Sequence, residues 1–305
     1  MSTTQQHIQT SVGTPRLARA KDQTFKKELR RVTRYVLHSP LALLGVVLVA
    51  LTVLITLFAP WISPHDPYAV DLNLTLTPPN ATFWLGTDEA GRDLLSRIFS
   101  GAQTSVTTGV AVIVITLLFG SAVGATAGYL GGVADELIMR VADFFMAFPY
   151  LILAMAIVYS LGASIQNAIL AITVVFWPSY ARLVRGQVTS IRHREFVEAA
   201  RVLGATNRRI ILRHILPQTW GALVIKTSLD IGFAIVAMAS LGFIGLGAQP
   251  PSAEWGTLIA QSRTYALNAW WYGIFPGLAF FLSVLGFNLL GDAIQELVEP
   301  SLRRR

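Results

Sequence analysis

The sequence predicts an all-α integral membrane protein with six transmembrane helices. Hydrophobic residues make up 53% of the 305 positions and charged residues only 13%. A soluble domain carries roughly 25% charged residues, so this chain has about half of the charge that would cover a globule. The apolar residues also form long runs, and the mean hydropathy is +0.55. We therefore expect the chain to cross a membrane several times.

Six apolar runs are candidates for these spans, because about 30 Å of hydrocarbon requires roughly 20 residues of helix. The runs are Leu41–Ile62, Ser105–Leu130, Ile138–Leu161, Asn167–Tyr180, Gln218–Leu246 and Trp271–Leu290, the last with an extension to Leu297. The fourth run is the shortest. The first is interpreted as a retained span, since its apolar length of about 22 residues exceeds the roughly 7–15 residues of a signal peptide.

Basic residues orient the spans, because Lys and Arg near span ends stay in the cytoplasm. They gather before the first span, between the fourth and fifth spans, and at the end of the chain. These residues are Arg16, Arg19, Lys21, Lys26, Lys27, Arg30, Arg31 and Arg34; Arg182, Arg185, Arg192, Arg194, Arg201, Arg208, Arg209 and Arg213; and Arg303, Arg304 and Arg305. With six spans, both termini are cytoplasmic. The net charge of +7 then reflects membrane topology, and no nucleic acid partner is expected.

The expected organisation follows from these spans. It comprises a basic cytoplasmic tail (1–40), a first transmembrane helix (41–62), an extracytoplasmic segment with a short surface helix (63–104), a five-helix core (105–297) with a cytoplasmic loop (182–216), and a basic cytoplasmic tail (298–305). Trp and Tyr residues near the outer ends of the spans are expected at the membrane interface. They are Trp61, Tyr68, Trp84, Trp270, Trp271 and Tyr272.

The surface helix is expected within Leu85–Ser105, with Thr87 as its N-cap and Gly101 at its end. Asp93 and Arg97 stand four residues apart in it, a spacing at which side chains can pair. Such a helix could gate the outer mouth, contact a binding protein, or only brace the second span.

Glycines recur every four residues along the second span, at Gly120, Gly124, Gly128 and Gly132. Small residues at this spacing let two helices approach closely. The stripe is compatible with static packing and with a seam along which helices slide.

The stretch EFVEAARVLGATNRRIILRHILPQ (Glu195–Gln218, the charged segment) interrupts the apolar runs. Phe196, Val197, Ala200 and Leu203 are expected on one helical face, Gly204 is expected to end that helix, and Thr206 can cap a second short helix. Pro217 would stop the second helix or open the next span. Physical chemistry alone leaves two alternatives, a helix on the membrane surface and a helix presented to a protein partner.

The letters EAARVLG and HILP in this segment resemble the EAA loop of permeases in ATP-binding cassette (ABC) importers. The matching residues are Glu198, Ala199, Ala200, Gly204, Leu216 and Pro217, and His214 stands where the pattern has isoleucine. In that family the loop seats in a groove on a cytoplasmic ATPase. The resemblance implies that Glu198 holds this joint and that Gly204 permits its bend. The full set implied for ATPase coupling is Glu195, Glu198, Ala199, Ala200, Gly204, Ala205, Thr206, Leu216 and Pro217.

Three more stretches resemble the C-type permease of dipeptide and oligopeptide importers. They are Leu85–Ser105, Ser240–Ile259 and Phe287–Ile294, and the resemblance covers about Pro40 to Pro300. Gln103 replaces an expected arginine, and QELVEPSL (295–302) replaces a more usual Arg-Asp-x-Leu-Asp-Pro-Arg ending.

The resemblance implies a bacterial inner-membrane subunit that forms half of a translocation pathway. Its implied partners are a related B-type permease, two ATPases that bind ATP and Mg, and an extracytoplasmic binding protein. Peptides are the implied substrates, with nickel chelates, glutathione or opine-like compounds as alternatives. An ion-driven secondary transporter is a remoter alternative, since the sequence shows no internal repeat.

Lys226 and Asp230 are the charged residues inside the fifth span, four positions apart and thus on one helical face. Asp230 lies roughly 20 Å along the helix from Pro217, near the bilayer middle. It either lines the translocation path and meets the amino group of the substrate, or forms a structural pair with Lys226.

The sequence offers no catalytic motif or bound cofactor. Gly221–Thr227 superficially resembles a phosphate loop, but Ile225 stands where a glycine is needed before the lysine. The chain has no cysteine, which excludes disulfides and thiolate chemistry. ATP hydrolysis is therefore expected in partner chains.

Overall fold

The computed structural model describes residues 32–298, and within that range the chain is helical with one isolated β-bridge and no strand, so the predicted fold class is confirmed. The basic residues Arg16 to Arg31 and Arg303 to Arg305 lie outside the described residues. The helices are α2 (Pro40–Ile62), α3 (Leu94–Leu130), α4 (Gly132–Met146), α5 (Tyr150–Leu161), α6 (Ile165–Ile191), α7 (Glu195–Val202), α8 (Asn207–Ile210), α9 (Leu216–Phe243), α10 (Trp255–Ser262) and α11 (Trp270–Val298).

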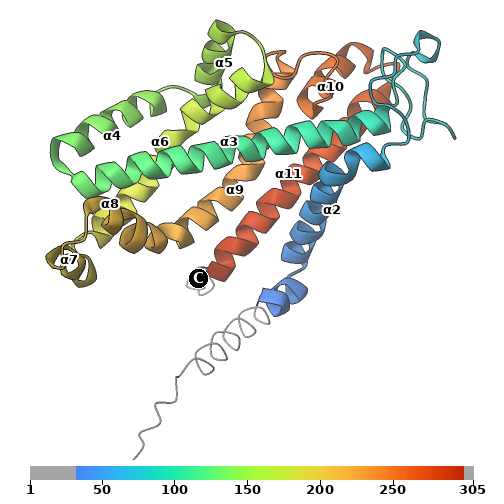
Figure 1. Cartoon of the computed structure of the whole chain (residues 1–305). Coiled ribbons are helices and arrows are strands. Elements are labelled where there is room, and N and C mark those ends of the chain that lie inside the picture. The colour runs from blue at the N-terminus through green and yellow to red at the C-terminus, as the bar shows by residue number, and fades with distance from the viewer. Residues whose placement is uncertain (1–31, 299–305) are drawn as a thin grey trace, which may run out of the picture.

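Five helical stretches in the described part of the chain are long and apolar enough to cross a membrane. They are α2, α3, α6, α11 and the stretch Asn207–Phe243, in which α8 and α9 continue each other. In Figure 1, α7 and α8 lie at one end of the bundle, and α10 lies at the other end beside the segment that precedes α3. The bundle thus has two distinct ends.

The predicted third span is wrong as a single helix. Its residues form α4 and α5, which meet at an angle of 90°. Pro149 lies at the break as the N-cap of α5. Proline has no backbone N–H and disfavours helical backbone in the residue before it, here Phe148, so the helix cannot run through. The predicted fourth span also ends too early, since α6 passes Tyr180 and continues to Ile191.

The predicted surface helix is absent, because its residues belong to two other elements. Residues 63–93 (the outer segment) form turns and one short 3-10 helix, and α3 then runs unbroken through Gly101. Asp93, rather than Thr87, caps α3 by accepting a hydrogen bond from the Ser96 backbone N–H. A Cβ on Gly101 would lie 3.0 Å from Trp255 Cδ1, so this glycine permits close packing on α10 instead of ending a helix.

Buried charges hold the outer segment together. Asp88 Oδ2 accepts a hydrogen bond from Arg92 Nε at 2.7 Å and forms an ion pair with Arg97 Nε at 3.0 Å, and all three side chains are buried. Arg97 therefore pairs with Asp88, and the predicted pair with Asp93 does not form. Buried ion pairs are costly to break from one side only, so this cluster fixes the shape of the segment.

The same segment covers two of the predicted interfacial aromatics. Trp271 Nε1 donates to the Thr87 carbonyl at 3.3 Å, and the Tyr272 hydroxyl donates to Glu89. Trp271 and Tyr272 are buried under the segment, whereas Trp61 is exposed. Their position at the start of a span could not distinguish lipid contact from contact with a folded loop.

The glycine stripe of α3 faces α6. A Cβ on Gly120 would lie 2.7 Å from Tyr180 Cβ, and one on Gly124 would lie 2.3 Å from the Ala181 carbonyl oxygen. A Cβ on Gly128 would lie 2.8 Å from the Arg185 carbonyl oxygen. The backbones of the two helices are therefore in direct contact over about two turns, as small residues at this spacing allow.

Gly124→Val should separate α3 from α6, because the new Cβ would overlap backbone that cannot move aside. Overpacking of this kind costs typically 1–3 kcal/mol, and we expect a lower melting temperature of the purified membrane protein. Gly186→Ala is the matched control, since nothing lies within 4 Å of a Cβ there. A Gly124→Val protein as stable as Gly186→Ala would contradict the close contact.

Candidate functional site

The charged segment folds as two short helices joined by a tight turn. Gly204 ends α7 with a φ of +79°, in the left-handed region that favours glycine. The Ala205 N–H donates to the Ala200 carbonyl at 3.0 Å across this turn. Thr206 then caps α8, with its hydroxyl oxygen accepting from the Arg209 N–H at 3.4 Å. Gly204 and Thr206 thus occupy the local positions that their residue types predict.

Pro217 opens the fifth span, as one of the two predicted alternatives, although the short helix before it continues into that span. Residues Ile211–Ile215 form a π-helical turn between α8 and α9, and Pro217 lies in the first turn of α9. In a regular helix the proline ring would clash with the carbonyl four residues earlier, and a wider π turn can relieve that conflict. The stretch Asn207–Phe243 therefore forms one continuous helix (the rod), and α7 precedes it across the turn at Gly204.

The inner side of the charged segment packs on the end of α3 around Tyr129. Val197 and Ile210 are fully buried in an apolar cluster that includes Tyr129. The Tyr129 hydroxyl donates to Asn207 Oδ1 at 2.8 Å, and Arg192 Nη1 donates to the Gly128 carbonyl at 2.9 Å. These contacts fix the position of α7 and α8 relative to the bundle.

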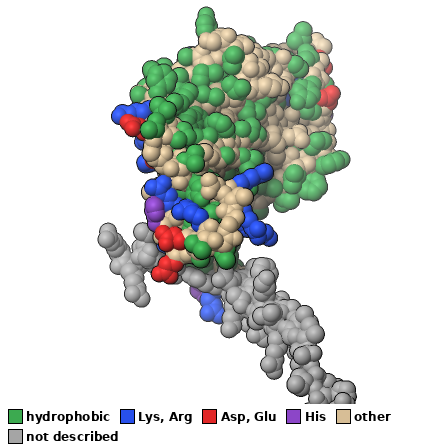
Figure 2. Space-filling model, turned by 60° about the vertical axis from the view of Figure 1, so that its left-hand side comes forward, with side chains coloured by type: hydrophobic (Ala, Val, Ile, Leu, Met, Phe, Trp, Pro, Cys, Tyr) green, Lys and Arg blue, Asp and Glu red, His purple; other side chains and the backbone are tan. Residues whose placement is uncertain are grey.

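The outer side of α7 combines apolar and acidic side chains. Val202 and Leu203 are each 86% exposed, and Phe196 is 37% exposed. Glu195 and Glu198 are also exposed, and neither forms an ion pair within residues 32–298. Figure 2 shows one face of the whole molecule, on which charged side chains gather toward the lower end, below an area of mainly hydrophobic and uncharged side chains.

The four residues predicted to share one apolar face divide into two pairs. Val197 is buried and Ala200 is half-buried, whereas Phe196 and Leu203 are exposed. The helix is too short to bury both sets on one neighbour. The exposed apolar tip, accompanied by unpaired acids, is the kind of surface that marks an interaction site.

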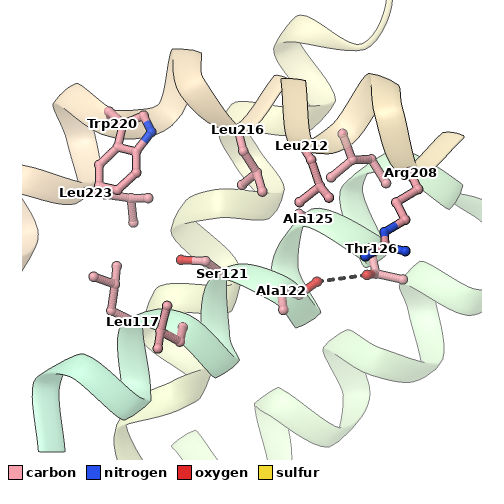
Figure 3. A pocket seen from close by; sticks show the side chains of 12 residues that line it. Leu117, Ser121, Ala122, Ala125, Thr126, Arg208, Leu212, Leu216, Trp220 and Leu223 are labelled. Atoms are coloured by element: carbon pink, nitrogen blue, oxygen red, sulfur yellow. Dashed lines mark hydrogen bonds between the residues drawn. The ribbon is translucent and has the colours of Figure 1, made fainter. Parts of the chain in front are cut away.

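An apolar groove of about 630 Å³ lies between α3 and the rod. In Figure 3, Leu212, Leu216 and Trp220 of the rod point toward α3, and Arg208 lies beside Thr126 at one end of the groove. The part of the rod from Arg208 to Leu223 is thus incompletely packed against α3.

Lys226 and Asp230 form an ion pair on α9, with Lys226 Nζ 3.0 Å from Asp230 Oδ2. Their side chains are 25% and 22% exposed. Lys226 Nζ also lies 4.9 Å from the ring centroid of Tyr180. The pair therefore forms as its spacing predicts, with an aromatic ring beside it that the sequence did not indicate.

A cavity of about 290 Å³ opens beside this pair (the paired-charge cavity). Its lining comes from the break between α4 and α5, from α6 and from α9: Phe145, Met146, Phe148, Tyr150, Val175, Phe176, Ser179, Lys226, Asp230 and Phe233. The aromatic residues were missed as site residues. The Phe148-Pro149-Tyr150 sequence was their available signal, since it places aromatics at a helix break within an apolar run.

Other polar groups in the described part of the chain indicate no metal site. No group of three or more His, Cys, Asp or Glu side chains there could hold a metal ion. Asp143, on α4, pairs with Arg182 of α6. The candidate site therefore has two parts. One is the exposed tip of the charged segment, at Val202 and Leu203, and the other is the paired-charge cavity. The rod runs from the turn behind the tip to this cavity.

Two family models match this chain. Residues 120–304 match the family described as binding-protein-dependent transport system inner membrane component. Residues 28–79 match the N-terminal TM domain of oligopeptide transport permease C. Together they span most of the described helices.

Several curated proteins are similar over most of their length. The probable D,D-dipeptide transport system permease protein DdpC of Escherichia coli (strain K12) is 48% identical over 86% of this chain and 88% of its own. The di/tripeptide transport system permease protein DppC of Pseudomonas aeruginosa (strain UCBPP-PA14) is 42% identical over 87% and 90%. The nickel transport system permease protein NikC of Escherichia coli (strain K12) is 41% identical over 85% and 94%.

A solved structure shares the fold. A chain of the inward-facing MetNI methionine ABC transporter superposes with a TM-score of 0.51 and 19% sequence identity. The match covers 67% of this chain and 96% of that chain.

Gly204→Val should loosen the turn between α7 and α8. Nothing lies within 4 Å of a Cβ at this position, so the cost comes from the left-handed backbone alone, roughly 1–2 kcal/mol. Trypsin cleavage after Arg201 or Arg208 in membrane preparations should become about 5–30 times faster, if cleavage follows local opening.

Gly204→Asn is the matched control, because asparagine tolerates this backbone region and should be cleaved nearly as slowly as the wild type. Equal cleavage of the valine and asparagine variants would contradict a conformational role for Gly204.

Proposed function

Because this chain belongs to the family of binding-protein-dependent transport system inner membrane components, we propose that it is the C-type permease subunit of an ATP-driven importer of short peptides. It is a multi-pass inner-membrane protein, and its family consists of transport permeases rather than catalytic subunits. The observation that carries the proposal is the exposed tip of the charged segment at the end of a membrane-spanning rod.

The proposed topology places both termini and the charged segment in the cytoplasm. The outer segment and α10 then face the opposite side. The arginines of the charged segment support this orientation, because basic residues near span ends remain cytoplasmic. The outer segment, held by its buried charges, would provide a rigid surface at the extracytoplasmic mouth.

The charged segment is proposed to dock on a cytoplasmic ATPase. Val202 and Leu203 would enter an apolar groove of the partner, and Glu198 would meet polar or basic groups at its edge. The exposed acids Glu195 and Glu198 on the same helix favour a protein partner over a membrane surface, because an anionic lipid surface would repel them. The proposed coupling set remains Glu195, Glu198, Ala199, Ala200, Gly204, Ala205, Thr206, Leu216 and Pro217.

The rod would carry movement of the ATPase into the membrane. Asn207 and Asp230 are on the same helical stretch, about 35 Å apart at 1.5 Å per residue. The groove beside α3 leaves room for the cytoplasmic part of the rod to tilt. A displacement at α7 would then change the shape of the paired-charge cavity.

This chain would supply half of the translocation path. The paired-charge cavity borders α4 and α5, which carry exposed apolar residues such as Phe144, Ile152 and Tyr159. A related B-type permease is proposed to cover this surface. Two ATPases, which would bind ATP and Mg, and an extracytoplasmic binding protein would complete the importer.

Peptides are the proposed substrates. Two relatives are named as dipeptide or di/tripeptide permeases, and the cavity offers the Asp230 carboxylate to the ammonium group of a peptide. The relative named as a nickel permease supports the alternative of a nickel chelate. Glutathione and opine-like compounds belong to the same alternative.

Glu198→Ala should uncouple the importer while leaving it assembled, because this side chain is exposed and has no partner within residues 32–298. In proteoliposomes with the ATPases and the binding protein, we expect peptide-stimulated ATP hydrolysis and peptide uptake to fall at least tenfold, a loss of about 1.4 kcal/mol in coupling.

Glu136→Ala provides the matched control. Glu136 is also exposed and forms only a surface ion pair with Arg140 at 3.7 Å, which contributes little. It should leave ATP hydrolysis and uptake unchanged. Normal coupling in the Glu198→Ala complex would exclude the proposed docking role.

A further inference from the structure

We propose that Lys226 is a built-in cation that occupies the ammonium site of the substrate on Asp230, and that a primary amine of the substrate displaces it toward the face of Tyr180. The inference rests on the proposed import function and assigns a chemical selectivity to the paired-charge cavity. The ligand class is a solute with a free primary ammonium group, such as the N-terminus of a short peptide.

Asp230 requires a neighbouring cation in every position that the rod adopts. It lies within a membrane-spanning helix, where an unpaired carboxylate is costly. Lys226 is the sole basic side chain of residues 32–298 within 4 Å of Asp230. An amine that replaces Lys226 would therefore keep Asp230 paired, whereas a neutral or anionic solute that displaced Lys226 would leave the carboxylate unpaired.

Lys226 has a second position within reach. Its Nζ is already 4.9 Å from the centroid of the buried Tyr180 ring, inside the range of a cation–π contact. The flexible four-carbon side chain of lysine can shift its ammonium between the carboxylate and the ring without moving the backbone. Displacement thus gives up the ion pair but keeps the cation–π contact, and it does not leave the lysine ammonium without a partner.

The cavity can hold an amine and the apolar group next to it. The rings of Tyr150, Phe176 and Phe233 contact one another, and the Phe233 centroid lies 5.1 Å from that of Tyr150 and 5.5 Å from that of Phe176. These rings form an aromatic wall beside Asp230, and aromatic faces attract ammonium groups. A volume of about 290 Å³ suits an amino-terminal residue, while the rest of a peptide would extend toward the partner permease.

A purely structural pair predicts different behaviour from a displaceable one. If the pair only stabilises α9, loss of either charge weakens the fold and no solute compensates. If Lys226 occupies the ammonium site, its removal opens that site. Lys226→Met should then bind an amine more tightly than the wild type, and Asp230→Asn should lose the preference for an amine.

The experiment measures dialanine binding to the purified permease–ATPase complex without the binding protein, because the binding protein makes its own selection. N-acetyl-dialanine, which lacks the ammonium group, is the comparison probe. The thermal shift of the complex reports the dissociation constant. For the wild type we expect binding of dialanine and at least tenfold weaker binding of N-acetyl-dialanine.

The variants test the two roles separately. Lys226→Met should lower the dissociation constant for dialanine roughly tenfold. Ethylamine should also raise the melting temperature of the Lys226→Met complex more than it raises that of the wild-type complex. Asp230→Asn should bind the two probes equally. Asp143→Asn is the matched control: it removes a carboxylate from another ion pair, that with Arg182, outside the cavity lining, and should preserve the wild-type preference.

Two outcomes would overturn the inference. Equal binding of both probes to the wild type would remove the ammonium site, and weaker dialanine binding by Lys226→Met would assign that lysine to the ligand's carboxylate or to structure. Uptake of dialanine in the complete proteoliposome system separates these failures from failure of the proposed function. If uptake occurs, only the ammonium site is wrong; if the wild type takes up no peptide, the proposed substrate and this inference both fail.

Discussion

The continuity of the rod is the constraint on which the rest of the structure depends. A π-helical turn at Ile211–Ile215 lets the chain pass Pro217 without a break. With a conventional helix end there, the charged segment would be a loop attached by a flexible joint. As one helix, residues 207–243 form a lever that begins at the turn behind the exposed tip and carries the Lys226–Asp230 pair within the membrane.

A lever needs a rigid support, and α3 and α6 supply it. Their backbones meet along Gly120, Gly124 and Gly128, and the end of α3 near Tyr129 is bonded to Asn207 and Arg192. The groove between α3 and the rod is apolar and incompletely filled. Tight packing of α3 on α6 and free volume between α3 and the rod favour tilting of the rod over displacement of the whole bundle.

The sequence predicted features set by local chemistry. Apolar length located the spans, the residue types of Gly204 and Thr206 located the turn, and the four-residue spacing predicted the contact between Lys226 and Asp230. Features set by tertiary contact were missed. Gly101 looked like a helix end because its packing on Trp255 is invisible in sequence, and α6 extends past Tyr180 because packing on α3 overrides the polar residues there.

The break between α4 and α5 explains why a charged pair can persist on the rod. An unbroken third span would pack its apolar side chains against α9 and leave no space for an ion pair. The 90° bend instead places Phe148 and Tyr150 beside a cavity that Lys226 and Asp230 can share. A solute can shift a conformational equilibrium only if it binds the two conformations with different affinity. A solute that binds Asp230 contacts the helix that runs back to the turn behind the exposed tip, so any difference in its fit between two tilts of the rod is transmitted to that end.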